Sequence, residues 1–360
     1  IEFAKTVDDA APYTVGSQQA QKISYDLMAT LPQNWDSSGA MIAPASFVIT
    51  DLIKDGLTVN PAFDISAEFV TKSGAEIEEF PSGANWTASS APANGGENLT
   101  ITVGEVGRDK MRQTASANPG AKVIFTVAAA VATTATLMAP IENDAHLAIN
   151  EGATDEVSLE SRTVATYWGP LTFEKFQAVE GTTVPLAGAK FKLFLSEAHA
   201  RAALDATAVR GSAVVASDAT GEVTFTGLRA SDFANGALVH PGTYDGADCV
   251  ADPNYIVYWL TEVAAPAGHE LLAAPIPVVL EVDGDLKEVT DATLVSGPNA
   301  EEGDPCEFAE MTEFSSVENV VSRAGHPLPF AGGLGTYLLV IGGAALVAVV
   351  VTLALRRRAG

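Results

Sequence analysis

Residues 258–268 read Tyr-Trp-Leu-Thr-Glu-Val-Ala-Ala-Pro-Ala-Gly. The first six alternate between apolar and polar side chains, which is the pattern of a β-strand with one face in a core. The Ala-Ala-Pro-Ala-Gly that follows ends this strand. Glu262 falls on the same face as Tyr258 and Leu260, so a carboxyl group is expected inside a core, where it has to be paired or neutral.

The surrounding residues 168–319 form short strand-like runs separated by Gly, Pro, Asn and Asp. This arrangement is typical of a β-sandwich. Its first strand places Lys175 on the same face as Leu171 and Phe173, so a second ionisable side chain is expected to point inward.

Two further segments give local predictions. Residues 196–209 are predicted to form a helix with Ser196 as its N-cap. Residues 121–139 are apolar enough to suggest a membrane span, but they contain Lys122 and several threonines, and apolar residues recur with a period of two. A β-strand is therefore predicted there.

The composition excludes several classes of protein. The 360 residues carry 45 acidic and 20 basic side chains, a formal charge of −25, which opposes binding to a phosphate backbone. Charged residues make up 18% and apolar residues 47% of the chain, so it is no disordered acidic tail. The two cysteines form no CxxC motif or Cys/His cluster, which excludes a structural zinc site, and neither a metal nor a cofactor is predicted.

The C-terminal segment has three parts in a fixed order. Residues 337–355 carry no charge and are long enough to cross a bilayer as a helix. Three arginines at 356–358 follow, and the positive-inside rule places the tail, residues 356–360, in the cytoplasm. Residues 323–336 precede the span and contain the pentapeptide Leu328, Pro329, Phe330, Ala331 and Gly332.

Four motifs occur in order within residues 168–322, namely FEKF, PLAGAKFKL, GEVTFTGL and YWLTEVAAPAG. Together they resemble the CnaB-type domain of Gram-positive pilins. In that family a lysine of the first strand forms an isopeptide bond with an asparagine of the last strand, assisted by a buried glutamate. The resemblance assigns these roles to Lys175, Asn319 and Glu262, while Val263 and His269 depart from the family pattern.

The chemistry implied by the resemblance suits these residue types. A lysine is a nucleophile only when it is neutral, and an apolar site lowers its pKa. A protonated Glu262 can polarise the amide of Asn319 and shuttle protons while ammonia leaves. The reaction happens once per molecule, so the resemblance implies self-processing and not enzyme activity.

The N-terminal residues 1–165 are also rich in strand and turn patterns. Lys5, then Val15-Gly16, then Thr50-Asp51 before Gly56-Leu57, and then Asn143-x-Ala145-x-Leu147 occur in this order. This order resembles the fimbrial D2-type isopeptide domain, which is CnaA-like. The resemblance assigns Lys5 as the amine, Asn143 as the amide and Asp51 as the carboxyl that assists. The alternative is that Lys5 is an exposed terminal lysine and Asp51 a turn residue. Residues 66–113 match no motif.

The C-terminal arrangement resembles the sorting signal of Gram-positive surface proteins. Sortase would cleave between Ala331 and Gly332 and pass the new carboxyl group to an amine, after a transient membrane-held intermediate. Ala331 stands where the usual motif has Thr, which leaves open whether a pilus-specific or a housekeeping sortase acts. The alternative is a simple tail-anchored membrane protein.

Export bears on the two cysteines. An exported chain with two cysteines most often pairs them, and one disulfide is common in the resembling domains. We therefore expect a disulfide between Cys249 and Cys306, with free thiols as the alternative.

The sequence thus predicts an all-β chain of two tandem Ig-like β-sandwich domains followed by a C-terminal transmembrane helix. The resemblance implies a structural subunit of a sortase-assembled pilus anchored to the cell wall, with sortase, neighbouring pilin subunits and peptidoglycan as partners. A monomeric wall-anchored adhesin that binds a host ligand is the alternative, and an anchored enzyme lacks a catalytic constellation. The short spacer, residues 320–327, favours the polymer, because a monomer normally needs a long stalk to clear the wall. The acceptor lysine motif of pilins, Tyr-Pro-Lys, is absent and is expected upstream of Ile1 in a longer parent chain; the alternative is a basal or minor subunit.

Overall fold

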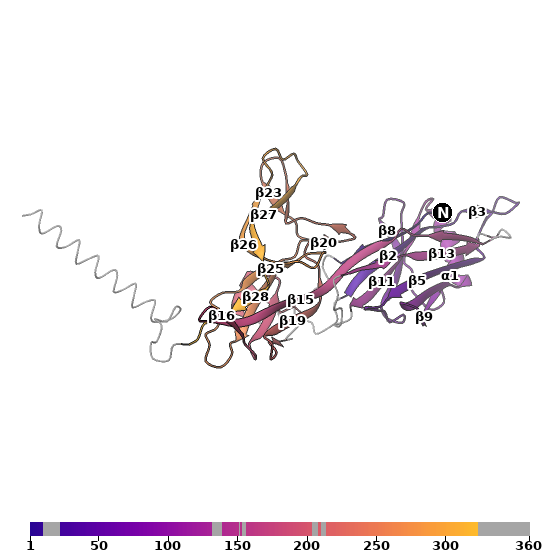
Figure 1. Cartoon of the computed structure of the whole chain (residues 1–360). Coiled ribbons are helices and arrows are strands. Elements are labelled where there is room, and N and C mark those ends of the chain that lie inside the picture. Colours follow the sequence, from indigo (N-terminus) through magenta and orange to yellow (C-terminus); the bar gives the residue numbers. More distant parts are fainter. Residues whose placement is uncertain are drawn as a thin grey trace, which may run out of the picture. The chain divides into compact units, whose positions relative to one another are not determined.

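The computed structural model is shown in Figure 1. It describes residues 1–9, 22–131, 139–150, 152, 156–203, 208–209 and 214–322. By its internal contacts the chain divides into a larger unit, Ile1–Pro266 with Leu271–Asn319, and a smaller unit, Ala267–Glu270 with Val320–Gly360.

The predicted span, 337–355, and the pentapeptide, 328–332, lie outside the described residues. Within the described part of the chain, no helix is long and apolar enough to cross a membrane.

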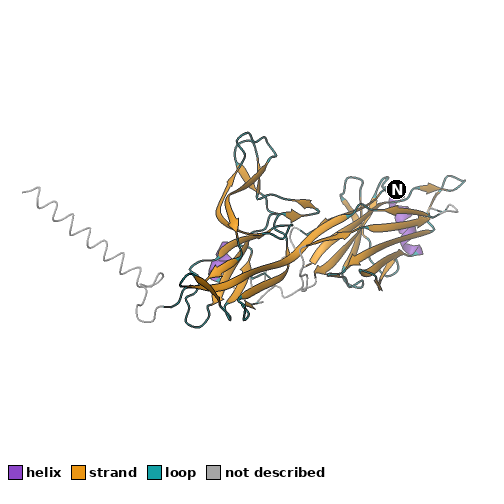
Figure 2. Cartoon of the chain, in the orientation of Figure 1, coloured by secondary structure: helices purple, strands orange, loops and turns teal. Residues whose placement is uncertain are grey.

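The N-terminal part of the larger unit consists of two antiparallel sheets that share one hydrophobic core, called here the first sandwich (Figure 2). The first sheet contains, in order, β1 (Phe3–Asp8), β2 (Lys22–Thr30), β11 (Lys122–Val131), β7 (Ile65–Val70) and β8 (Glu76–Glu79), with β6 (Leu57–Thr58) also paired to β11. The second sheet contains β14 (Val157–Glu160), β13 (Ala145–Asn150), β5 (Ser46–Lys54), β10 (Gly96–Val103) and β9 (Trp86–Ala93). A small hairpin joins β3 (Asn34–Trp35) to β4 (Met41–Ile42).

Strand β11 confirms the strand predicted within residues 121–139, as far as those residues are described. Every second side chain of β11 is buried, including Val123, Phe125 and Val127, so its apolar period of two matches one buried face.

Helix α1 (Glu105–Ala117) was not predicted from the sequence. Its buried residues are Gly107, Met111, Thr114 and Ala115, which form a face of mostly small or polar side chains. A Cβ atom added at Gly107 would lie 2.2 Å from the carbonyl oxygen of Asn85, so the helix approaches that backbone closely because this residue has no side chain.

The C-terminal part of the larger unit also consists of two sheets around one core, called here the second sandwich. One sheet contains β12 (Ala139–Asn143), β15 (Val164–Val179), β16 (Thr182–Pro185), β19 (Glu222–Arg229) and β28 (Ser316–Glu318). The other contains, in order, β18 (Val215–Ala216), β17 (Lys190–Phe194), β24 (Tyr258–Ala264), β25 (Ile276–Leu280), β26 (Leu286–Val295), β27 (Pro305–Glu313), β22 (Gly242–Tyr244) and β23 (Cys249–Ala251). A further hairpin joins β20 (Phe233–Ala234) to β21 (Ala237–Leu238).

Strand β15 contributes to both cores. Trp168 in its first half belongs to the core of the first sandwich, and Leu171 and Phe173 belong to the core of the second. The pairing with β19 shifts register between Gly169 and Leu171, around Pro170, which has no N–H to donate to a ladder. The prediction of an all-β chain is confirmed, and one continuous strand crosses the predicted domain boundary between residues 165 and 168.

Helix α2 (Glu197–Ala202) begins as predicted but ends earlier. The side chain of Ser196 accepts a hydrogen bond from the backbone N–H of His199, which confirms the N-cap. The prediction that the helix continues to residue 209 is wrong, because Ala203 adopts the left-handed conformation and Ala208 forms a β-bridge with Phe194.

The described part of the smaller unit is a short antiparallel contact. The N–H of Glu270 donates to the carbonyl oxygen of Val320, and the N–H of Ser322 donates to that of Gly268. Around these bonds His269 and Val321 form an isolated β-bridge.

Candidate crosslinking sites

The first candidate site lies in the core of the first sandwich. Lys5 is on β1, Asp51 is on β5 and Asn143 is the last residue of β12. Asp51 pairs in register with Ala145 on the adjacent β13, so the turn between β12 and β13 brings Asn143 toward Asp51. All three predicted side chains are at most 1% exposed, and the alternative of an exposed Lys5 does not hold.

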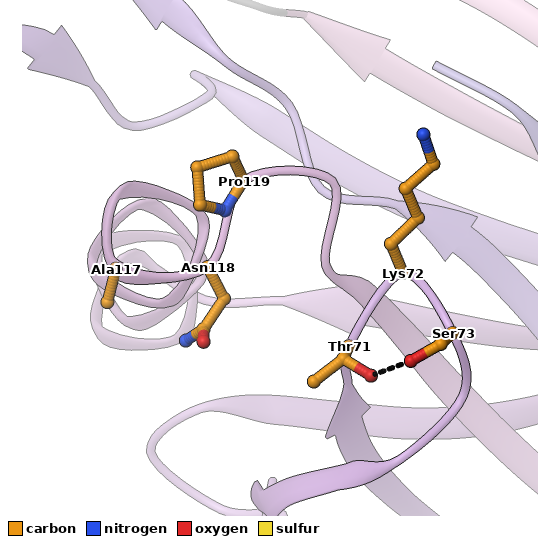
Figure 3. A pocket seen from close by; sticks show the side chains of 6 residues that line it. All are labelled: Thr71, Lys72, Ser73, Ala117, Asn118 and Pro119. Carbon is orange, nitrogen blue, oxygen red and sulfur yellow. Dashed lines mark hydrogen bonds between the residues drawn. The ribbon is translucent and has the colours of Figure 1, made fainter.

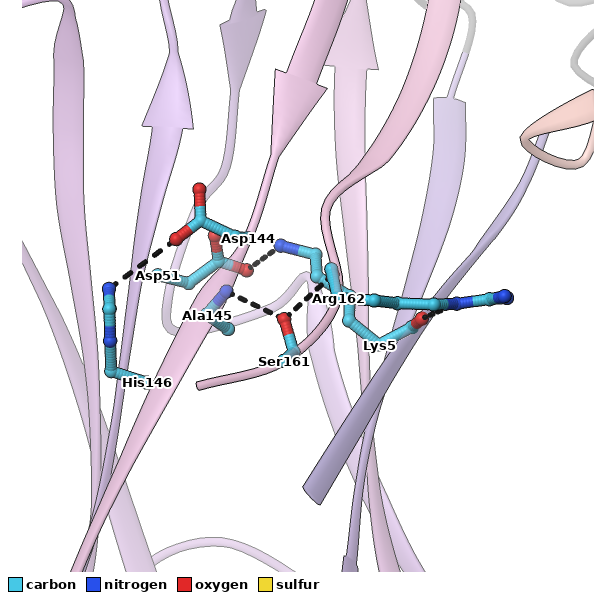
Figure 4. A network of polar contacts seen from close by, with 7 residues as sticks. All are labelled: Lys5, Asp51, Asp144, Ala145, His146, Ser161 and Arg162. Atoms are coloured by element: carbon cyan, nitrogen blue, oxygen red, sulfur yellow. Dashed lines mark hydrogen bonds and ion pairs between the residues drawn. The ribbon is translucent and has the colours of Figure 1, made fainter. Parts of the chain in front are cut away.

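The amine and the carboxylate of this site are in direct contact (Figure 4). Lys5 Nζ donates a hydrogen bond to Asp51 Oδ2 at 2.6 Å. Lys5 Nζ also lies 4.5 Å from the centre of the ring of Tyr25, on the neighbouring β2. The lysine is thus held between an acid and an aromatic face.

Burial changes the acid–base properties of this pair. Desolvation lowers the pKa of Lys5, and the attraction of Asp51 opposes this only in part. Desolvation likewise raises the pKa of Asp51, against the effects of Lys5 and of the nearby side chain of Asn143. Both shifts favour the state in which the proton is on the carboxyl group and the amine is neutral.

The second candidate site lies in the core of the second sandwich. Lys175 is on β15, Glu262 is on β24, and Asn319 directly follows β28. The short β28 runs parallel to β15, with Val317 opposite Lys175, and the N–H of Asn319 donates to the carbonyl oxygen of Phe176 at 2.9 Å. This pairing places Asn319 close to Lys175.

One carboxylate oxygen contacts both reactants of the second site. Glu262 Oε1 accepts a hydrogen bond from Asn319 Nδ2 at 2.9 Å and lies 3.9 Å from Lys175 Nζ. Its other oxygen, Oε2, accepts the backbone N–H of Leu272 at 2.9 Å, which fixes the orientation of the carboxyl group. Sequence patterns contained no signal for this contribution of Leu272.

Lys175 is fully buried, and desolvation lowers its pKa to about 8, although Glu262 and Glu318 act in the opposite direction. An amine with this pKa is neutral in about a tenth of molecules at pH 7, far more than an ordinary lysine. The neutral amine is the form that acts as a nucleophile.

The aromatic neighbours of the two lysines were not identified from the sequence as site residues. Tyr25 lies on β2 with its ring 4.5 Å from Lys5 Nζ, and the ring of Phe191, on β17, lies 5.7 Å from Lys175 Nζ. Both residues are buried and follow the period of two of their strands. This alternation was the signal in the sequence that could have identified them as inward aromatic neighbours of the lysines.

The predicted disulfide is confirmed. Cys249 on β23 and Cys306 on β27 are bonded, with their Cα atoms 6.0 Å apart. Strand β22 lies between them and pairs with both strands, so the bond spans a three-strand ribbon.

Other hollows and charge clusters in the described residues carry less chemistry. Figure 3 shows a pocket between the turn after β7 and the end of α1, lined by Thr71, Lys72, Ser73, Ala117, Asn118 and Pro119. Two groups of side chains in the described residues are close enough together to hold a cation, and most of their members are exposed. They are Asp144, His146 and Glu160, and the three carboxylates Glu281, Asp283 and Asp285.

No protein-family model matches the sequence. Over 158 residues, which are 43% of this chain and 24% of the relative, it is 30% identical to fimbrial subunit type 1 of Actinomyces viscosus. The chain thus spans about a quarter of the length of this curated relative.

Solved structures match over most of the chain. The fimbrial protein FimP from Actinomyces oris matches with a TM-score of 0.62 at 19% identity, over 89% of this chain and 68% of that one. Domains D2 and D3 of the major pilin SpaD from Corynebacterium diphtheriae match with a TM-score of 0.55 at 20% identity, over 89% of this chain and 99% of that one. The predicted resemblance is confirmed at the level of the fold: the chain has the fold of a Gram-positive pilin.

Proposed function

We propose that this chain is a structural subunit of a sortase-assembled pilus on the surface of a Gram-positive bacterium. Its two Ig-like domains, residues 1–165 and 168–322, would be stiffened by isopeptide bonds, Lys5–Asn143 in the first and Lys175–Asn319 in the second. The observation that carries this proposal is the presence of two fully buried lysine–carboxyl–asparagine clusters, one in each core.

The geometry of the second site supports a complete reaction. Neutral Lys175 attacks the side-chain carbonyl carbon of Asn319, and a tetrahedral intermediate forms. Glu262 Oε1, within reach of both nitrogens, takes a proton from the lysine nitrogen and returns it to Nδ2. The bond from carbon to Nδ2 then breaks, ammonia leaves, and an amide between the two side chains remains.

The first site supports the same reaction with a different starting contact. Here Asp51 is bonded to the amine, so the proton on Lys5 can pass directly to Asp51 Oδ2. The neutral amine then attacks Asn143, the protonated carboxyl gives its proton to the departing nitrogen, and the resulting carboxylate takes the second proton from the lysine nitrogen.

Covalent bonds at these positions suit a fibre under tension. Lys175 is on the first strand of the second core and Asn319 follows the last, so a bond between them bypasses the residues in between. Tension applied along the chain then passes through one covalent link and leaves the intervening strands unstretched. A subunit built in this way resists extension without a large change in its folded contacts.

Assembly would use the C-terminal signal. We propose that residues 337–355 hold the chain in the membrane while a sortase cleaves between Ala331 and Gly332 and transfers the carboxyl group of Ala331 to an amine. A neighbouring pilin subunit or the peptidoglycan would provide that amine. The product is attached to the cell wall and supports adhesion to a host surface.

The polymer is tested by immunoblotting wall extracts from which all non-covalently bound protein has been removed. A ladder of high-mass species that disappears when sortase genes are deleted is the expected result. A single species of subunit size in the wall fraction would contradict the pilus proposal and favour a monomeric adhesin.

A further inference from the structure

Tyr25 is buried beside the first candidate crosslink. On the paired strands β1 and β2, Lys5 lies opposite Leu27 and Val7 lies opposite Tyr25. All four side chains therefore share the inward face, and Tyr25 is diagonal to Lys5. The lysine nitrogen is 4.5 Å from the centre of the tyrosine ring, and only 1% of Tyr25 is exposed.

The hydroxyl group of Tyr25 is placed to act on the amide. Its oxygen is fully buried and has no hydrogen-bond partner among the described residues. Asp51 raises the pKa of this hydroxyl and the side chain of Asn143 lowers it, so the hydroxyl lies near both groups. A buried hydroxyl without a settled partner is costly unless a later state of the site uses it.

The protonation state makes this hydroxyl a donor. Burial and the nearby carboxylate of Asp51 raise the pKa of Tyr25 well above its ordinary value. The phenol therefore keeps its proton throughout the range in which Lys5 can lose one. It can donate a hydrogen bond to a developing negative charge, and it does not compete with Asp51 as a base.

The two sites differ in the aromatic ring beside the lysine and in the contact of the carboxyl group. In the second site Asn319 Nδ2 donates to Glu262 Oε1, and the ring beside Lys175 belongs to Phe191, which has no hydroxyl. In the first site Asp51, with its shorter side chain, is bonded to the lysine instead. Asp51 Oδ1 and both polar atoms of the Asn143 amide have no hydrogen-bond partner among the described residues, so the carbonyl oxygen of Asn143 is left for a donor from another side chain.

We propose that Tyr25 is the oxyanion donor of the first crosslinking reaction, which rests on the proposed formation of a Lys5–Asn143 bond. When the neutral amine of Lys5 adds to the side-chain carbon of Asn143, the carbonyl oxygen becomes negatively charged. The Tyr25 hydroxyl donates a hydrogen bond to this oxygen. As the carbonyl re-forms, the bond to Nδ2 breaks, ammonia leaves with the proton that Asp51 took from Lys5, and Asp51 takes the second proton from the lysine nitrogen, so the new amide is neutral.

The test compares the full chain with its Tyr25→Phe variant, made by cell-free synthesis in detergent and followed after translation is stopped. At each time a sample is denatured and digested, and the peptides joined through Lys5–Asn143 and through Lys175–Asn319 are quantified by mass spectrometry. Removing one oxyanion donor typically slows a reaction by about a hundredfold or more. We expect that slowing for Lys5–Asn143 alone, with the Lys175–Asn319 rate unchanged as an internal reference.

A second measurement separates this role from packing. Tyr25→Phe is also made in an Asn143→Ala background, where no first crosslink can form, and thermal unfolding is recorded. Unchanged melting temperature together with a slowed first reaction supports the proposal. An unchanged rate, an equal slowing of both reactions, or a slowing matched by a large loss of melting temperature would overturn it. If the parent chain forms only the Lys175–Asn319 bond, the proposed first crosslink itself fails, and this inference fails with it.

Discussion

Glu262 and Asn319, 57 positions apart in the sequence, are joined by a 2.9 Å hydrogen bond between a carboxylate oxygen and the side-chain amide, inside the second core. The same oxygen lies 3.9 Å from the amine of Lys175. A single carboxyl group thus contacts both the nucleophile and the leaving group of the proposed reaction. This arrangement makes the role of Glu262 separable from that of Asp51 in the other core.

Glu262→Ala is expected to abolish the Lys175–Asn319 bond and leave Lys5–Asn143 intact, and Asp51→Ala is expected to do the reverse. The two sites share no side chain, so the effects should be additive. Loss of the second bond also removes a constraint on the unfolded chain, worth about 5 kcal/mol by the loop-entropy model. Intact mass and thermal unfolding of both variants measure these effects. Loss of both bonds in either single variant would show that the sites are not independent.

The lowered pKa of Lys175 predicts that the free energy of unfolding depends on pH in a variant that cannot form the crosslink. In Asn319→Ala the amine still titrates, at about 8 in the folded state and at its ordinary value of 10.5 when unfolded. Between these values the unfolded chain binds more protons, so the free energy of unfolding should rise with pH across that window. Below about pH 8 both states are protonated and this contribution is constant.

The control for this pH effect is the double variant with Lys175→Met and Asn319→Ala. It keeps every other titrating group, so the difference between the two denaturation profiles isolates Lys175. A difference that does not change between pH 8 and 10.5 would contradict a lowered pKa at this position.

Gly221 is expected to be essential to the placement of Lys175. Its φ is +82°, and an added Cβ would lie 2.4 Å from the carbonyl oxygen of Lys175. Gly221→Ala should lower the free energy of unfolding by about 1–3 kcal/mol and reduce the fraction of chains with a Lys175–Asn319 bond. Gly181→Ala is the matched control, since its φ is +81° but no atom lies within 4 Å of an added Cβ. Equal effects of the two substitutions on crosslinking would refute the steric argument.

The disulfide between Cys249 and Cys306 is expected to stabilise the second sandwich. The bond joins residues 57 positions apart, and by the loop-entropy model it is worth about 4 kcal/mol. Replacing both cysteines by serine should lower the free energy of unfolding, measured by chemical denaturation, by a matching amount. The parent protein in reductant provides a parallel measurement. Denaturation that is unaffected by both changes would show that the unfolded chain gains little freedom when the bond is lost.

Strand alternation was enough to predict the inward positions of Lys175 and Glu262. Each lies on a strand whose other inward residues are apolar, so the odd charged residue stands out in the sequence. The placement of Asn319 beside Lys175 depends on a parallel pairing of β15 with the short β28, and no local pattern encodes which distant strand pairs with which.

Helix α1 and the end of α2 show where local patterns fail. The buried face of α1 includes a glycine and a threonine in place of an apolar stripe, so its sequence lacks the periodicity that predicts a helix. Helix α2 ends at a left-handed alanine, although alanine favours helices, because the chain turns there toward the β-bridge at Ala208. In both places tertiary contacts outweigh local preference.

The most direct test of the central claim is the intact mass of residues 1–322, purified after expression and fully denatured and reduced. Two internal crosslinks predict a mass below the sequence mass by two ammonia molecules, with fragment spectra that place the links at Lys5–Asn143 and Lys175–Asn319. A deficit of one ammonia would reject one of the two sites, and the fragments would identify it. A mass equal to that of the sequence would contradict the crosslinking account altogether.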